Sequence, residues 1–360
     1  MKKDLFVVSL LGYKEKYDFV NQLNKAFNLI DVHILGDEKN LDFFKRKIHN
    51  IKNVSYILYL LPANDRAIKK KKYINNLKKI NFIKKKVSNN FFLITFEIIY
   101  SQIQVLDLFL PNIFFYFLRI VNSISNIFIK DYYKYFPPTF TILTGLKTIY
   151  KIPLSKTNNI FWHSHDYETY KKYIRKKNNQ MRTAIYLDQP FDVNFDKYYT
   201  GNNPDKSFGV FYEKLKKFLD NVEYKYNLKV IIANHPRREN FQHSIFKKFE
   251  NYNNKTAELI SNCKLVFAHC SLSISFATLF NKDMVFLSSE ELDKSIYNKR
   301  INIFSKFFGC SAIKIPKENI DLSKYYANKQ KYPQYIKNYV KNENSENVNF
   351  KDLILKRIDV

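Results

Sequence analysis

The side chains best suited to bind a phosphate group follow directly after short apolar runs within residues 229–292. His235 and Pro236 follow the first of these runs, and Ser271 and Ser273 follow the second. Serine hydroxyls and imidazoles donate hydrogen bonds that suit phosphate oxygens. These residue types therefore indicate a site for a ligand that carries a phosphate.

Parallel strands are expected to position these residues. The three apolar runs, residues 230–233, 265–268 and 284–287, are too short for helices and each contains a β-branched residue, which is typical of buried parallel strands. Residues 271–280 are predicted to form a helix, whose first N–H groups favour an anion. Since ligands of open α/β sheets bind outside the carboxyl ends of the strands, the polar residues at these ends are predicted to form one site.

Each of these residues also has an ordinary structural explanation, and the sequence leaves both explanations open. A serine at the start of a helix often only caps it. His235 precedes a proline, which favours an extended conformation and ends the strand sharply. Arg237 suits a phosphate but is equally explained as a surface charge. Glu290 and Glu291 follow the third run, where they either accept hydrogen bonds from a ribose or a base amine, or occupy the first turn of a helix.

Together, His235-Pro236 and the serines at 271 and 273 resemble the nucleotide-binding half of bacterial GT-B glycosyltransferases. The sequence is similar to those that use CMP-activated keto-acid sugars: the sialyltransferases, Kdo transferases and nonulosonic-acid transferases of surface polysaccharide synthesis. The resemblance extends over roughly residues 162–292. In these families two adjacent serines contact the phosphate, and here Cys270 stands in the first position.

This resemblance implies an α/β fold of the GT-B type, in which two Rossmann-like domains face a central cleft. It implies inverting transfer of a CMP-linked sugar to a glycan or glycolipid acceptor, with the nucleotide sugar as substrate and no further cofactor or metal. The nucleotide and its phosphate are then expected to contact His235, Pro236, Arg237, Ser271, Ser273 and Glu290. The alternatives are a UDP- or GDP-sugar donor in the same fold, or a non-catalytic basic protein that binds nucleic acid or a membrane surface.

A glycosyltransferase also needs a base that takes the proton of the acceptor hydroxyl. Asp188 is favoured, because it follows the strand predicted at residues 184–187 and partly matches the short acidic motif of the resembled sialyltransferases. Asp166 and His165 are the next candidates. The ordinary explanation of Asp188 is a turn residue ahead of Pro190.

A second histidine group lies between the two halves of the sequence. His163 and His165 follow the apolar residues 160–162 and are assigned to the acceptor side or the cleft. Surface or capping roles explain them equally well. Together with Asp166 they could also bind zinc, but the sequence shows no complete ligand set.

The alternation of strands and helices predicts a parallel sheet in each half of the chain. Residues 1–155 are predicted as the first, acceptor-side domain, residues 156–320 as the nucleotide-sugar domain, and residues 321–360 as a helical tail that crosses back to the first domain. The first half is expected to contain strands at residues 5–11, 30–35, 54–61, 91–99 and 139–144 and helices at residues 14–28 and 41–50. In the second half, residues 208–226 are expected to be helical.

Composition narrows the function classes. The formal net charge of +27 favours anionic partners, but there is no signature of a sequence-specific nucleic-acid-binding motif. Neither a Gly-rich dinucleotide fingerprint nor a Walker motif is present. The 3 widely spaced cysteines favour a reducing, cytoplasmic location. The positive charge suits peripheral contact with an anionic inner membrane. Asp107, Pro111 and Arg119 interrupt the apolar residues 103–129, which argues against a spanning helix.

Overall fold

The structure is a computed structural model in which two compact units are described separately. Unit 1 contains described residues up to His165 together with residues from Lys337 onward, and unit 2 runs from Asp166 to Ile336. The described residues are 3–9, 21–33, 55–59, 93–99, 140–148, 158–174, 181–191, 208–236, 244–293, 295–317 and 319–358.

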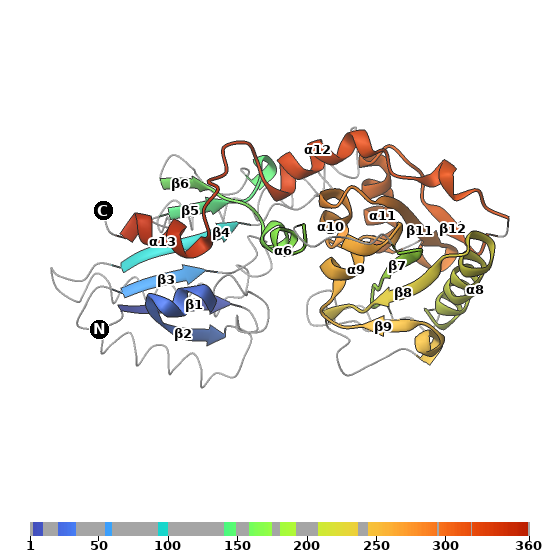
Figure 1. The fold of residues 1–360 in the computed structure, drawn as a ribbon, viewed down its shortest axis with the longest axis horizontal. Coiled ribbons are helices and arrows are strands. Elements are labelled where there is room, and N and C mark those ends of the chain that lie inside the picture. The colour runs from blue at the N-terminus through green and yellow to red at the C-terminus, as the bar shows by residue number, and fades with distance from the viewer. Residues whose placement is uncertain are drawn as a thin grey trace. The chain divides into compact units, whose positions relative to one another are not determined.

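Unit 1 is built on a parallel, 6-stranded sheet with the order β2-β1-β3-β4-β5-β6 (Figure 1). Its strands are β1 (Lys3–Ser9), β2 (Phe27–His33), β3 (Ser55–Tyr59), β4 (Leu93–Ile99), β5 (Phe140–Leu143) and β6 (Asn158–Phe161). The first five of these strands confirm the expected ones to within a few residues. Parallel pairing on both sides explains why these segments are rich in apolar and β-branched residues.

Two segments of unit 1 differ from the expectation. Where a helix was expected over residues 14–28, the described residues show a 3-10 turn at Gln22–Lys25, and Phe27 already pairs with Lys3 as the first residue of β2; residues 14–20 lie outside the described residues. The second domain was expected to begin at residue 156, but β6 still pairs in parallel with β5. The chain therefore leaves the first unit after residue 165, about ten residues beyond the boundary expected at 155.

Residues 337–358, here called the C-terminal segment, belong to unit 1. α12 (Tyr332–Tyr335) continues into a π-helical turn (Ile336–Val340), and α13 (Phe350–Ile358) follows. The segment is fixed around Trp162, whose indole N–H donates to the Val348 carbonyl at 3.0 Å. The Trp162 carbonyl accepts from the Ser345 hydroxyl at 2.7 Å. The Trp162 ring lies 4.9 Å from the Phe350 ring.

Unit 2 contains a second parallel, 6-stranded sheet with the order β12-β11-β10-β7-β8-β9 (Figure 1). Its strands are β7 (Thr183–Leu187), β8 (Lys229–Ala233), β9 (Glu250–Tyr252), β10 (Leu265–Ala268), β11 (Asp283–Ser289) and β12 (Ile313–Ile315). The described helices of this unit are α6 (His165–Tyr173), which begins at the unit boundary, α8 (Phe208–Tyr226), α9 (Thr256–Asn262), α10 (Ile274–Leu279), α11 (Ile296–Phe307) and α12 at its end.

Every residue of β7 and β10 is buried, as expected of central strands covered on both faces. The three strands predicted around the phosphate motif are β8, β10 and β11. With two Rossmann-like parallel units and a C-terminal segment that returns to the first of them, the fold is α/β and GT-B-like, as predicted.

α10 is shorter than the helix expected at residues 271–280. It begins at Ile274, because the residues before it form a turn in which the backbone N–H of Ser273 donates to the Ser271 hydroxyl at 3.2 Å. Serine hydroxyls often close such local turns in competition with a helix. The helix thus starts three residues later than the sequence pattern indicates.

Within the described part of the chain, no helix is both long and apolar enough to cross a bilayer. The apolar residues 103–129 lie outside the described residues.

Candidate functional site

The carboxyl ends of four neighbouring strands of unit 2 bring the predicted residues to one edge of the sheet. β11, β10, β7 and β8 are adjacent and parallel. Leu187 pairs with Ala233 and Tyr186 with Phe267, so the next residues along each strand stand side by side. This edge, here called the carboxyl edge, consists of Asp188, Asn234–Pro236, His269–Ser273 and Ser289–Glu291.

Asp188 ties the end of β7 to the end of β8. Only 2% of its surface is exposed. Its backbone N–H donates to the Ala233 carbonyl at 3.1 Å, and its carboxylate oxygen Oδ2 accepts from the backbone N–H of His235 at 3.2 Å. A carboxylate held this firmly beside a histidine has a fixed direction, which both a base and a purely structural residue require.

The His-Pro motif occupies the end of β8. His235 is half-buried and Pro236 is exposed. The backbone N–H of the preceding Asn234 donates to the Tyr252 carbonyl at 3.0 Å, which fixes the backbone ahead of the histidine, and its amide Nδ2 donates to Asn253 Oδ1 at 2.9 Å. Arg237 lies outside the described residues.

The serine group occupies the loop between β10 and α10. Ser271 and Ser273 are half-buried, whereas Ser275 lies in the core. The Ser273 side chain does not cap α10, so its hydroxyl has no structural role in starting that helix. The Ser275 hydroxyl donates to the Asp166 carboxylate. Asp166 is thereby held by α10, on the core side of the serine loop.

His269 was not predicted as a site residue, although it directly follows a buried strand. It is fully buried. Its Nδ1 donates to the Leu287 carbonyl of β11 at 2.7 Å, and its Nε2 accepts from the Tyr186 hydroxyl of β7 at 3.1 Å. Burial lowers the pKa of His269 to about 4, so the ring is neutral at pH 7 and this tautomer satisfies both partners. The imidazole cross-links β7, β10 and β11 beneath the carboxyl edge.

Cys270 replaces the first serine of the resembled motif but is not a nucleophile. Burial raises the pKa of its thiol to about 12, and the charge of Arg300 opposes this only in part. The thiolate that a nucleophilic cysteine needs is therefore absent at neutral pH.

α11 supplies a further side of the site that the sequence analysis missed. The Tyr297 ring lies 4.8 Å from that of Phe191, just beyond the end of β7. Arg300 lies three residues further on, hence on the same helix face. It is exposed and makes no ion pair with any residue that the structure describes. A periodic apolar pattern at residues 296, 301 and 304 was the available signal for this helix.

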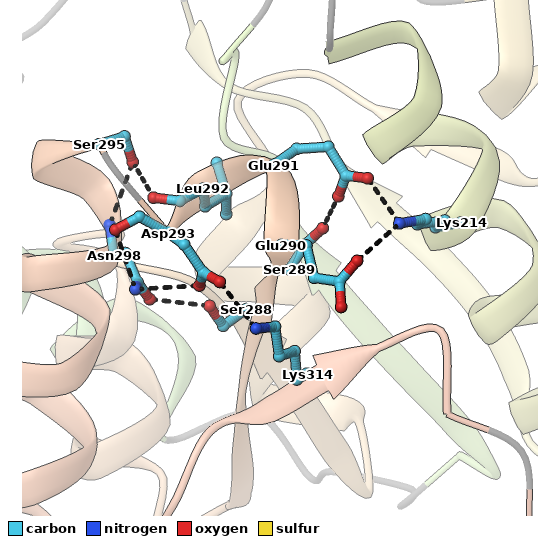
Figure 2. A network of polar contacts seen from close by, with 10 residues as sticks. All are labelled: Lys214, Ser288, Ser289, Glu290, Glu291, Leu292, Asp293, Ser295, Asn298 and Lys314. Carbon is cyan, nitrogen blue, oxygen red and sulfur yellow. Dashed lines mark hydrogen bonds and ion pairs between the residues drawn. The ribbon is translucent and has the colours of Figure 1, made fainter.

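Glu290 and Glu291 differ in their exposure to solvent and in their contacts with Lys214, which Figure 2 draws. The Glu291 side chain is 10% exposed and accepts from the Lys214 ammonium at 2.5 Å and from the Ser289 hydroxyl. The Glu290 side chain is 70% exposed and lies 3.7 Å from the same ammonium. Lys214 belongs to α8, 77 residues away in sequence from Glu291, and no sequence pattern pointed to it.

Hydrogen bonds set the direction in which the pKa values of Glu291 and Lys214 are shifted. Burial alone would raise the pKa of Glu291, but the hydrogen bonds from Lys214 and Ser289 outweigh it and lower that pKa. The hydrogen bond to Glu291 raises the pKa of Lys214. Glu291 is therefore a carboxylate and Lys214 an ammonium throughout the neutral range.

The other contacts in Figure 2 fix the start of α11. The Ser295 hydroxyl caps the helix by accepting from the backbone N–H of Asn298 at 3.3 Å. Asn298 Oδ1 accepts from the Ser288 hydroxyl of β11 at 2.9 Å. The Asp293 carboxylate pairs with Lys314 of β12 at 2.7 Å. These bonds attach α11 to the end of the sheet.

His163 and His165 lie just before the boundary between the two units, whereas the carboxyl edge belongs to unit 2. Both belong to unit 1. His163 is fully buried, with its ring 4.2 Å from that of Trp162, and its backbone bridges to Lys341. Among the residues that can be described, no group of three or more His, Cys, Asp or Glu side chains is arranged to hold a metal ion.

A scan against protein-family models and a search of characterised protein sequences found no match. Solved structures align along the chain at low identity. UDP-GlcNAc 2-epimerase from Methanocaldococcus jannaschii, in complex with UDP-GlcNAc and UDP, is 10% identical with a TM-score of 0.45, over 100% of this chain and 99% of that one. S. aureus MnaA with UDP is 10% identical with a TM-score of 0.47, over 100% and 96%. The spinosyn rhamnosyltransferase SpnG is 7% identical with a TM-score of 0.45, over 99% and 100%.

Proposed function

We propose that the carboxyl edge of unit 2 binds the nucleotide of a sugar donor and that the protein is an inverting, metal-independent glycosyltransferase. The proposed donor is a CMP-activated keto-acid sugar and the proposed acceptor is a surface glycan or glycolipid. The observation that carries the proposal is the convergence of Asp188, His235, Ser271 and Glu290 at four adjacent strand ends. In sheets of this class, ligands bind at such ends.

The phosphate of the donor is proposed to lie over the loop between β10 and α10. The hydroxyls of Ser271 and Ser273, with the half-buried His235, supply donors already in place as negative charge develops on the leaving phosphate. Arg300 adds an exposed cation from α11. A neutral thiol at Cys270 adds no negative charge that would repel the phosphate.

Asp188 is the proposed base, with Asp166 as the next candidate. In the proposed reaction the carboxylate takes the proton of the acceptor hydroxyl, and the acceptor oxygen forms a bond to the anomeric carbon. The bond between that carbon and the phosphate oxygen breaks, and its electron pair leaves with the nucleotide. Attack opposite the leaving group inverts the configuration.

A UDP- or GDP-linked donor would use the same edge, because the named residues suit phosphate and ribose and none of them selects a base. A location at the cytoplasmic face of an anionic membrane suits the net charge of +27, since basic surfaces are drawn to such membranes.

The test is a thermal-shift panel with CMP, UMP, UDP, GDP and a short polynucleotide, each at low and high salt. A ligand that binds only the folded protein raises its Tm. We expect a shift with CMP that persists at high salt and is lost in Ser271→Ala. A shift with UDP or GDP would change the donor and keep the site. A shift with the polynucleotide alone, confined to low salt, would replace the proposal with non-specific charge binding.

A further inference from the structure

Lys214 stands at the carboxyl edge although it comes from a helix remote in sequence. α8 follows β7 and leads into the parallel strand β8, so its N-terminal half lies at the carboxyl ends of the strands. From there the Lys214 ammonium reaches Glu291 at 2.5 Å and Glu290 at 3.7 Å (Figure 2). It is the charged group that sits between the two glutamates.

The two carboxylates differ in how many short hydrogen bonds they accept. Both oxygens of Glu291 are engaged, one by Lys214 and the other by the Ser289 hydroxyl. Among the residues that the structure describes, the Glu290 carboxylate contacts the ammonium alone, at the longer distance, and most of its side chain faces solvent. A ligand hydroxyl can therefore reach the Glu290 carboxylate without displacing a short hydrogen bond, whereas at Glu291 it would have to break one.

Lys214 also makes this arrangement electrostatically feasible. Adjacent carboxylates repel each other. The ammonium offsets one of the two negative charges and anchors Glu291, which holds the short turn Glu290–Leu292 in place. Glu290 is the first residue of that turn, so its backbone is positioned through Glu291.

We propose that Lys214 is a positioning residue that presents Glu290 to the ribose hydroxyls of the bound nucleotide, with Glu291 and Ser289 as its anchors. The inference rests on the proposed nucleotide site. It makes ribose recognition depend on an ion pair between α8 and the end of β11, and it gives Glu291 no direct contact with the ligand.

The experiment compares binding of CMP and 2′-deoxyCMP, with the corresponding UMP pair in parallel, by calorimetry on the full chain. Each protein is first checked for folding by its thermal transition. The variants are Glu290→Gln, Lys214→Met and Lys214→Arg. The matched control is Lys216→Met, which removes another partly exposed lysine of α8, one that pairs with Asp220 at 2.8 Å.

A hydrogen bond to a charged group is worth about 10- to 100-fold in affinity, so the wild type is expected to prefer the ribonucleotide by about 10-fold or more. Glu290→Gln and Lys214→Met should reduce that preference to a few-fold or less. Lys214→Arg should restore most of it, and Lys216→Met should leave it unchanged.

The outcomes separate this inference from the proposed function. If Lys214→Met weakens both nucleotides equally and keeps the wild-type preference, the lysine is merely structural and the inference is overturned. If the wild type binds ribo- and deoxynucleotide equally, Glu290 does not read the ribose, while the nucleotide site stands. Absence of any nucleotide binding by the folded wild type overturns both.

Discussion

Gly145 lies against the backbone of Asn338 so closely that no side chain fits between them. A Cβ atom at residue 145 would stand 2.3 Å from the Asn338 carbonyl oxygen and 2.8 Å from the Tyr339 nitrogen. Gly145 follows β5, and Asn338 lies in the π-helical turn of the C-terminal segment. The absence of a side chain at this position therefore sets how closely that segment packs on unit 1.

Gly145→Ala is expected to destabilise unit 1, because the backbone on both sides would have to shift. Overpacking of this kind costs about 1–3 kcal/mol. The measurement is the midpoint of urea unfolding. Gly209→Ala is the matched control: a Cβ there meets nothing within 4 Å, and the residue lies in α8, where alanine favours the helix by up to about 1 kcal/mol. Equal midpoints for the two variants would contradict the packing argument.

His269 is expected to make stability depend on pH between about 4 and about 6.5. Its pKa in the folded protein is lowered to about 4 from an ordinary value of 6.5, so in this range the unfolded chain binds a proton that the folded protein excludes. The contribution is complete above pH 6.5 and is lost as the pH falls towards 4. By linkage it amounts to on the order of 3 kcal/mol.

The measurement for His269 is urea unfolding of the wild type and His269→Asn at several pH values from 4.5 to 7.5. The wild type should be more stable than the variant at pH 7, and the difference should shrink as the pH falls. Two parallel stability curves would mean that the imidazole does not titrate in this way.

Trp162 should report directly on the packing of the C-terminal segment, because it is the only tryptophan in the chain. Its ring is 1% exposed and adjoins Phe350, which is fully buried. Phe350→Ala is expected to cost about 3–5 kcal/mol and to shift tryptophan emission to longer wavelength as water reaches the indole.

The control for Phe350 is Lys356→Ala, which removes an exposed lysine of α13 whose ammonium lies 3.6 Å from the Glu346 carboxylate. Exposed ion pairs contribute at most about 1 kcal/mol, so the emission should stay unchanged. An unchanged spectrum in Phe350→Ala would show that α13 does not shield the indole.

Asp188→Asn tests the proposed base. An amide of the same shape still offers an oxygen to the His235 N–H but cannot take a proton. We expect the rate of sugar transfer to fall by about 100- to 10,000-fold, with nucleotide affinity changed by less than about threefold. Transfer is measured with the donor whose nucleotide binds in the thermal-shift panel. If Asp166→Asn shows the larger loss in rate, the base is Asp166.

Most strands could be predicted from the sequence because buried segments show a local pattern of apolar residues. Residues 265–268 were predicted as a strand and form β10, and residues 208–226 were predicted as a helix and form α8. Their apolar patterns repeat with the period of the element. β9 and β12 were not predicted, because each has only 3 residues, which is too few for a periodic pattern to be recognised.

The site was less predictable because its geometry depends on residues far apart in sequence. The rules of parallel sheets alone place three strand ends together, those that carry Asp188, His235 and Ser271. Nothing near Lys214 indicates that it meets Glu291, 77 residues away. Nor does the sequence show that the Ser271 hydroxyl closes a turn with Ser273.

The path of the chain also has a consequence for synthesis on the ribosome. Unit 2 is continuous in the described chain, from Asp166 to Ile336, whereas unit 1 needs residues from Lys337 onward. The surroundings of Trp162 cannot form before residues 345–350 have been translated. Unit 1, whose strands are made first, is therefore completed last, and unit 2 can fold before the final segment of unit 1 has been made.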